Sequence, residues 1–308
     1  MTEPRTLEIV NWTMIVGIAI AALLLFHRTG ITFAWRSGRI PAFALAGLLL
    51  LGSYYRLLRQ DEVLGSTLIA SAQVIAYTAV AMPLSYLIAS LGGPLWDAAL
   101  LRSDLSLGLD WRAYLGFVNA HPALGLAFTL AYQSMLPQLI LALAVLGFTG
   151  REQELGIFLG AAILSGIIII VLSGVMPAMP VFTHLGLQPS DYSNLAPASG
   201  ELHVPLLNAL RAGALRSISL NDAMGIIAFP SYHAALGVIF GVAFWSVPRL
   251  RWPALVLNAV LLAATPIDGG HYFVDVLAGV AVAAISLAAM RSVRSNSVSR
   301  FRQAPAVA

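Results

Sequence analysis

Apolar residues in this chain form long stretches that are separated by shorter polar segments. Eight stretches come close to the roughly 17 to 25 residues that a helix needs to cross a bilayer, and they cover residues 12–26, 40–57, 63–90, 123–148, 155–177, 232–248, 252–267 and 272–290. Their continuous apolar character is typical of membrane helices rather than of amphipathic surface helices. The pattern predicts an all-α, polytopic membrane bundle of about eight helices. Six or seven are the alternative counts, because the first and seventh stretches are short.

The composition agrees with a membrane location. Of the 308 residues, 59% are hydrophobic and 10% are charged, and the mean hydropathy is +0.84. Soluble domains carry about 25% charged residues. Cysteine and lysine are both absent, which excludes disulfides, thiolate metal sites, thiol nucleophiles and Schiff-base lysines. The net charge of +3 is too small and too dispersed to indicate a nucleic-acid partner.

The arginines predict how the bundle is oriented. With eight spans, one side holds ten of them and the other side holds seven, four of which lie in two long connections where the positive-inside rule is least reliable. The ten are Arg5, Arg56, Arg59, Arg151, Arg249, Arg251, Arg291, Arg294, Arg300 and Arg302. We therefore expect both termini in the cytoplasm, in a bacterial inner membrane, with the opposite face toward the periplasm or the exterior.

The two long connections, about 91–122 and 178–231, fall on that opposite face. Unstructured connections of this length are uncommon and are usually functional. We expect them to cover a site as a cap or a substrate-contacting surface. Trp96 and Trp111, in the first connection, fit interfacial anchors.

Two polar segments at the starts of apolar stretches are the candidates for chemistry. The first reads Phe-Pro-Ser-Tyr-His at 229–233, and the second reads Asp-Gly-Gly-His-Tyr-Phe-Val-Asp at 268–275. His233 and His271 are separated by about two bilayer crossings and a turn, so both should return to one membrane face. Asp275 follows His271 by four residues and therefore shares its face of a helix.

These residue types suit phosphoryl transfer on a lipid. An imidazole can act as a nucleophile, an acid or a base near neutral pH, and a carboxylate can fix its tautomer. Gly269 and Gly270 allow the backbone to approach a phosphate closely, and the start of a helix near His233 would present N–H groups to an anion.

A different class of function also places His and Asp in membrane segments. A transporter or channel could use them as a proton relay, but it would need ionisable residues deep in several spans. Here they gather at one face, which favours an enzyme. Whether the phosphoryl group passes to water or to a second lipid's hydroxyl stays open.

The two segments resemble motifs of the type 2 phosphatidic acid phosphatase superfamily, and their aromatic residues are most similar to the inositol phosphorylceramide synthase branch. They also resemble sphingomyelin synthases. The resemblance implies that His271 forms a phosphohistidine, that Asp275 orients it, and that His233 protonates the leaving group and activates the acceptor. It also implies a six-helix catalytic core over 63–290, preceded by membrane helices in 1–62 and followed by a polar cytoplasmic tail in 291–308.

The chain departs from the wider superfamily in its cations. It lacks the lysine of the first motif, and Thr265 stands where the third motif has an arginine. Arginines of the second connection could supply the missing charge. The predicted substrate-binding residues are Ser231, Gly270, Tyr272, Arg211 and Arg216. We expect a lipid substrate in the bilayer, with a lipid hydroxyl as the alternative acceptor to water; the mechanism requires no metal or other cofactor.

Overall fold

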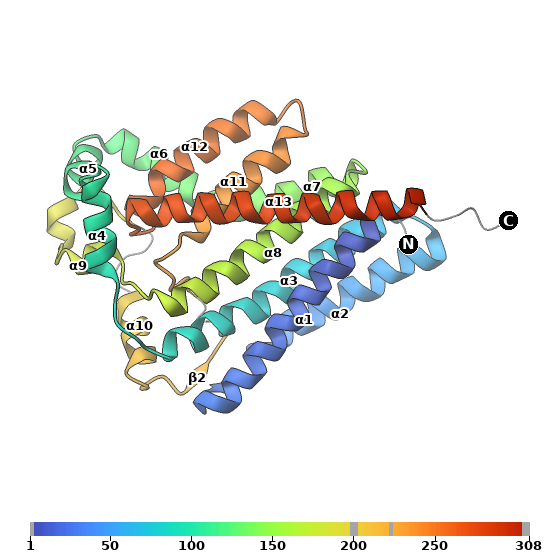
Figure 1. Ribbon diagram of the computed structural model, residues 1–308, viewed down its shortest axis with the longest axis horizontal. Coiled ribbons are helices and arrows are strands. Elements are labelled where there is room, and N and C mark those ends of the chain that lie inside the picture. The colour runs from blue at the N-terminus through green and yellow to red at the C-terminus, as the bar shows by residue number, and fades with distance from the viewer. Residues whose placement is uncertain (1–2, 198–202, 222–223, 304–308) are drawn as a thin grey trace.

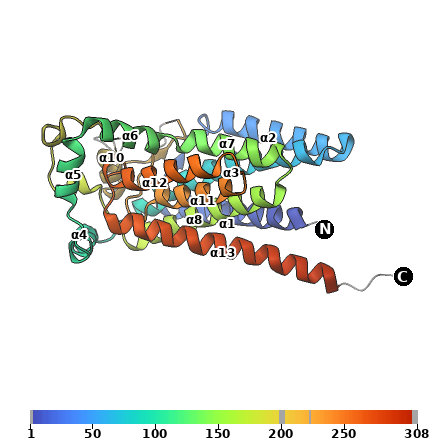
Figure 2. The same ribbon diagram turned by 90° about the horizontal axis from the view of Figure 1, so that it is seen from above.

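Long helices lying side by side make up most of the protein, and shorter helices gather at one end (Figure 1). The computed structural model describes residues 3–197, 203–221 and 224–303. Both termini lie at the end opposite the short helices, as two perpendicular views show (Figures 1 and 2). The molecule therefore has a long-helix body and one elaborated end.

Each predicted apolar stretch lies, to within three residues at its ends, within one helix or two consecutive helices. In chain order these are α1 (Glu3–Thr29), α2 (Arg39–Tyr54) with a π-helical extension (Tyr55–Arg59), α3 (Glu62–Ser90), α6 (Pro122–Gln133), α7 (Met135–Phe148), α8 (Glu152–Val175), α11 (Tyr232–Trp245), α12 (Arg251–Asp268) and α13 (Phe273–Gln303). The prediction of an all-α, polytopic bundle is confirmed.

The number of spans is smaller than eight. Within the described ranges, five helices are long and apolar enough to cross a membrane, or six if α6 and α7, which meet at 46°, form one bent span. The difference lies in α11 and α12. The 14 residues of α11 reach only about 21 Å at 1.5 Å per residue, and α12 carries Arg251, Asn258 and Asp268.

Within the described ranges, the two long connections form short helices and a strand, and the expectation that they are unstructured is wrong there. Residues 91–122 contain α4 (Asp97–Ser106) and α5 (Trp111–Asn119). The second connection contains α9 (Val181–His184), a 3₁₀ turn (Pro189–Tyr192), α10 (His203–Arg211) and β2 (Ser217–Ile218). β2 pairs in parallel with β1 (Thr32–Phe33). Trp111 is only 1% exposed, so the expectation that it is an interfacial anchor is wrong.

α8 occupies the middle of the bundle, where α1, α3, α11 and α13 all pack against it. Large apolar side chains of α8 and α11, including Phe158, Phe240 and Phe244, are buried in this core. Small residues let the helices approach closely. At Gly279 of α13, an added Cβ would collide with the carbonyl oxygen of Ser231, so this glycine brings the starts of α11 and α13 together.

Candidate active site

The two histidine segments are joined directly through their backbones. The N–H of Ser231 donates to the carbonyl oxygen of Asp275 at 3.0 Å. Ser231 also caps α11, because its hydroxyl oxygen accepts the N–H of Ala234 at 3.3 Å. The start of α11, with His233 in its first turn, is therefore docked against the first turn of α13.

His271 lies between α12 and α13 and is only 3% exposed. Gly270 before it has φ +63°, a conformation that suits glycine, and it turns the chain into the site. The Nδ1 atom of His271 lies 2.6 Å from the carbonyl oxygen of Ala228. A carbonyl can only accept a hydrogen bond, so Nδ1 carries the proton and Nε2 keeps its lone pair in the neutral ring.

Asp275 is fully buried and lies close to His271, but it is not the nearest acceptor. Its Oδ2 atom is 3.4 Å from Nδ1 of His271 and accepts the backbone N–H of Tyr272 at a shorter 2.9 Å. The carboxylate therefore anchors the turn that carries His271, and the Ala228 carbonyl makes the shorter contact with the ring.

His233 is held by Tyr132 at the end of α6. The two rings stack at a centroid distance of 4.1 Å with 16° between their planes, and the Tyr132 hydroxyl lies 3.1 Å from Nδ1 of His233. When that hydroxyl donates to Nδ1, the neutral ring carries its proton on Nε2. A Cβ added to Gly269 would lie 2.9 Å from the same hydroxyl and 2.5 Å from Cδ2 of His271. Gly269 thus sits between His271 and Tyr132.

Both histidines line one cavity of about 470 Å³. Its wall is mostly apolar and is built by α3, α8, the ends where α6 and α7 meet, the segment 224–227, the start of α11 and the turn before α13. It includes Tyr77, Met82, Met135, Ile169, Ile170 and Ile227. Among the described residues that line it, none is arginine, aspartate or glutamate. The cavity therefore combines two reactive imidazoles with space for an apolar molecule.

His203, the first residue of α10, is a third histidine on this wall. Its Nδ1 atom is buried and has no hydrogen-bond partner within the described ranges. Nothing near His203 in the chain resembles a ligand pattern, so the sequence alone does not mark it as a site residue. Only the fold of the second long connection brings it to the cavity.

Two carboxylates of α4 hold the second motif in place. Asp104, 0% exposed, accepts the backbone N–H groups of Phe273 at 2.9 Å and Val274 at 2.8 Å, and so caps the start of α13. Asp97 accepts the Tyr272 hydroxyl at 3.0 Å. The indole N–H of Trp111 donates to the carbonyl oxygen of His271 at 3.1 Å. Side chains in residues 97–111 thus hold four consecutive residues of the motif, 271–274, in place.

Burial raises the pKa values of Asp104 and Tyr272, which take part in these contacts. Desolvation raises the pKa of the Asp104 carboxyl, although the two N–H groups that it accepts act in the opposite direction. Burial, and then the adjacent Asp97 carboxylate, raise the pKa of Tyr272. Tyr272 therefore stays a hydroxyl donor throughout the physiological range.

The residues predicted to bind substrate lie in several different places. Ser231 and Tyr272 are both buried. The Ser231 hydroxyl accepts the N–H of Ala234, and the Tyr272 hydroxyl donates to Asp97. Arg211 donates to the carbonyl oxygen of Gly93 at 2.6 Å, and Arg216 is exposed beside β2. None of these four is among the residues that line the cavity. Gly270 shapes the turn before His271.

The described residues contain no group of three His, Asp or Glu side chains placed to bind a metal ion. A family model described as the PAP2 superfamily matches residues 98–289. No curated protein and no solved structure matches the chain significantly.

Proposed function

Because this chain belongs to the PAP2 superfamily, a family of phosphatase-type lipid enzymes, we propose that it transfers a phosphoryl group from a lipid through a phosphohistidine on His271. The observation that carries this proposal is the 2.6 Å contact between Nδ1 of His271 and the carbonyl oxygen of Ala228. It leaves Nε2 unprotonated and nucleophilic. His233 lines the same cavity and supplies the second imidazole that acid–base chemistry needs.

In the first step, Nε2 of His271 attacks phosphorus, the N–P bond forms, and the bond from phosphorus to the leaving oxygen breaks. His233 acts as an imidazolium, with Nδ1 donating to the Tyr132 hydroxyl; it gives the leaving oxygen the proton on its Nε2 and becomes a neutral imidazole. In the second step, His233 takes a proton from water or an alcohol, whose oxygen attacks phosphorus. The N–P bond then breaks and His271 is regenerated.

The charges around the cavity favour a phosphodiester substrate over a phosphomonoester. A monoester carries close to two negative charges at neutral pH, whereas a diester carries one. No arginine is found among the described residues that line the cavity, and the chain has no lysine. Three imidazoles and the start of α11 suit a single charge. We therefore favour headgroup transfer, as in the inositol phosphorylceramide synthase branch, over hydrolysis of a lipid monophosphate.

Purified protein, incubated with phosphatidic acid or with phosphodiester lipids such as phosphatidylinositol and a lipid alcohol, tests this function. Free phosphate, free headgroup and new lipid are measured separately, with His271→Ala as the control. We expect the wild-type protein to turn over a phosphodiester lipid and His271→Ala not to do so. Phosphate release from phosphatidic acid alone would overturn the diester assignment. No turnover of any lipid would overturn the proposed function.

A further inference from the structure

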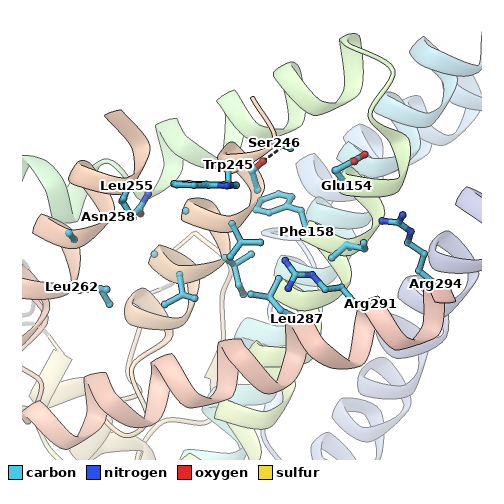
Figure 3. Close-up of a pocket in the computed structure, with 18 residues that line it drawn as sticks. Glu154, Phe158, Trp245, Ser246, Leu255, Asn258, Leu262, Leu287, Arg291 and Arg294 are labelled. Atoms are coloured by element: carbon cyan, nitrogen blue, oxygen red, sulfur yellow. Dashed lines mark hydrogen bonds between the residues drawn. The ribbon is translucent and has the colours of Figure 1, made fainter. Parts of the chain in front are cut away.

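We propose that a second lipid site, specific for a phospholipid with a net anionic headgroup, lies at the arginine-rich end of the bundle. It is a groove of about 580 Å³ between α8, α11, α12 and α13 (Figure 3). None of the described residues that line this groove also lines the histidine cavity. The groove is therefore separate from the proposed active site.

The position of the groove along α13 matches one membrane interface. His271 lies two residues before α13, which begins at Phe273, and Arg291 lies 18 residues after Phe273 on the same helix. At 1.5 Å per residue this separation is about 27 Å, close to the thickness of a bilayer core. Arg291 and Arg294 therefore stand at the interface opposite the histidines, where the headgroups of the other leaflet lie.

The charges at this end suit an anion. Arg291 and Arg294 are three residues apart and share a face of α13, and Figure 3 shows both side chains leaving α13 toward α8. Glu154 of α8 is the only acidic residue among those described around the groove. The two guanidinium groups leave a net positive charge after Glu154 is counted. A guanidinium binds phosphate oxygens well, and a net anionic lipid avoids placing its own cation beside the arginines.

The rest of the groove is apolar and suits acyl chains. Its walls include Val238, Val242, Leu255, Leu262 and Leu287. Gly241 of α11 opens the wall, because an added Cβ there would meet no atom within 4 Å. A headgroup at Arg291 and chains along α11 and α12 would have the orientation of a lipid within its leaflet.

Two substitutions target the groove, and each has a matched control. Arg291→Gln with Arg294→Gln removes the positive charge, and Arg249→Gln with Arg251→Gln removes the same charge from residues at this end that do not line the groove. Gly241→Leu fills the groove. Gly47→Leu on α2 is its control, because an added Cβ at Gly47 also meets nothing within 4 Å.

The measurement is the Tm of the purified full chain in detergent with added dioleoyl phosphatidylglycerol or dioleoyl phosphatidylcholine, with native mass spectrometry to count retained lipids. A ligand of the folded state raises Tm. We expect phosphatidylglycerol to raise Tm by several degrees more than phosphatidylcholine. This difference in Tm should disappear in the Arg291→Gln, Arg294→Gln double variant and in Gly241→Leu. It should persist in both controls.

Equal stabilisation by the two lipids, or an equal loss of the excess in the control pair, would overturn the site. The first result would show that any lipid fills the groove, and the second that the effect is general surface electrostatics. His271→Ala should keep the phosphatidylglycerol response, because the groove shares no lining residue with the histidine cavity. The outcome is therefore independent of the proposed catalytic function.

Discussion

The backbone N–H of Ser231 donates to the carbonyl oxygen of Asp275 at 3.0 Å. This bond ties the start of α11 to the first turn of α13, and so joins the two segments that carry the histidines. Gly279, one turn after Asp275, allows the contact, because a Cβ at this position would collide with the Ser231 carbonyl oxygen. The relative position of the two imidazoles depends on how closely these helices approach.

Gly279→Ala should therefore damage the site although it removes no chemical group. The added methyl group would push α11 away from α13 and weaken the Ser231–Asp275 bond. We expect a loss of activity of at least tenfold and a lower Tm, since overpacking costs about 1–3 kcal/mol. Gly241→Ala is the control, because its added Cβ meets nothing within 4 Å. Equal behaviour of the two variants would mean that the helix crossing does not position the histidines.

Asp104→Ala should uncap α13. The variant loses two hydrogen bonds to the N–H groups of Phe273 and Val274 and leaves buried donors unpaired, which costs about 1–3 kcal/mol for such a group. We expect kcat to fall as the turn at His271 loosens, with KM changing less. Asp104→Asn keeps one acceptor oxygen and should recover part of the loss. An unchanged kcat in both variants would restrict Asp104 to a role in stability.

The raised pKa of Asp104 gives this residue a pH signature. The folded state holds the proton to a higher pH than the unfolded state, so the contribution of Asp104 to the free energy of unfolding is largest below pH 3.8. It declines as the pH rises through the folded-state pKa. The difference in stability between wild type and Asp104→Asn should therefore shift in favour of Asn with rising pH. A pH-independent difference would contradict this.

The positions of the helices could largely be predicted from the sequence. The side chains that hold the two histidine segments in place could not. Continuous apolar sequence in a bilayer can satisfy its backbone only as a helix, and all eight stretches are helical. The two motifs were recognisable because their residues are local in the chain. Tyr132 and Asp104 contact those motifs from more than 100 residues away. Their neighbours in the chain carry no sign of these contacts, which arise only when the helices pack.

His271→Ala should abolish turnover while the protein stays folded, because the proposed nucleophile is lost. Activity above about a tenth of wild type would contradict its role.

Asp275→Asn tests the orientation of the ring. If Asp275 alone fixed the tautomer, the loss should reach about 10⁴-fold. Because the Ala228 carbonyl is the nearer acceptor at 2.6 Å, we expect a loss of about 10–100-fold in kcat. A loss of 10⁴-fold would show that the carboxylate dominates.

His203 should contribute to substrate binding rather than to the chemical step. Its Nδ1 atom is buried without a partner in the described part of the chain, and its side chain lines the histidine cavity. We expect His203→Ala to raise KM about tenfold with a small change in kcat, and His203→Gln to restore part of the affinity. His184→Ala is the control, because His184 lies in the same connection but does not line the cavity. Equal effects of both alanine variants would remove His203 from the site.

The last prediction concerns which side of the membrane the site faces. α11 and α13 both begin at the histidines and run toward arginines, Arg249 in one case and Arg291 in the other. The positive-inside rule places those arginines in the cytoplasm, so we expect the histidines at the outer interface. Both chain ends that Figure 1 marks lie at the arginine-bearing end.

Single cysteines can test this orientation without background, because the chain has no cysteine of its own. Ser190 is exposed in the 3₁₀ turn at the histidine end, and Ser295 is exposed near the end of α13. We expect Ser190→Cys to react with an impermeant thiol reagent in intact cells, and Ser295→Cys to react only after permeabilisation. The reverse pattern would show that the bundle has the opposite orientation and that the chemistry takes place at the cytoplasmic leaflet. The pairing of His271 with Ala228 and of His233 with Tyr132 would be the same in either orientation, because it depends on helix packing and not on the side of the membrane.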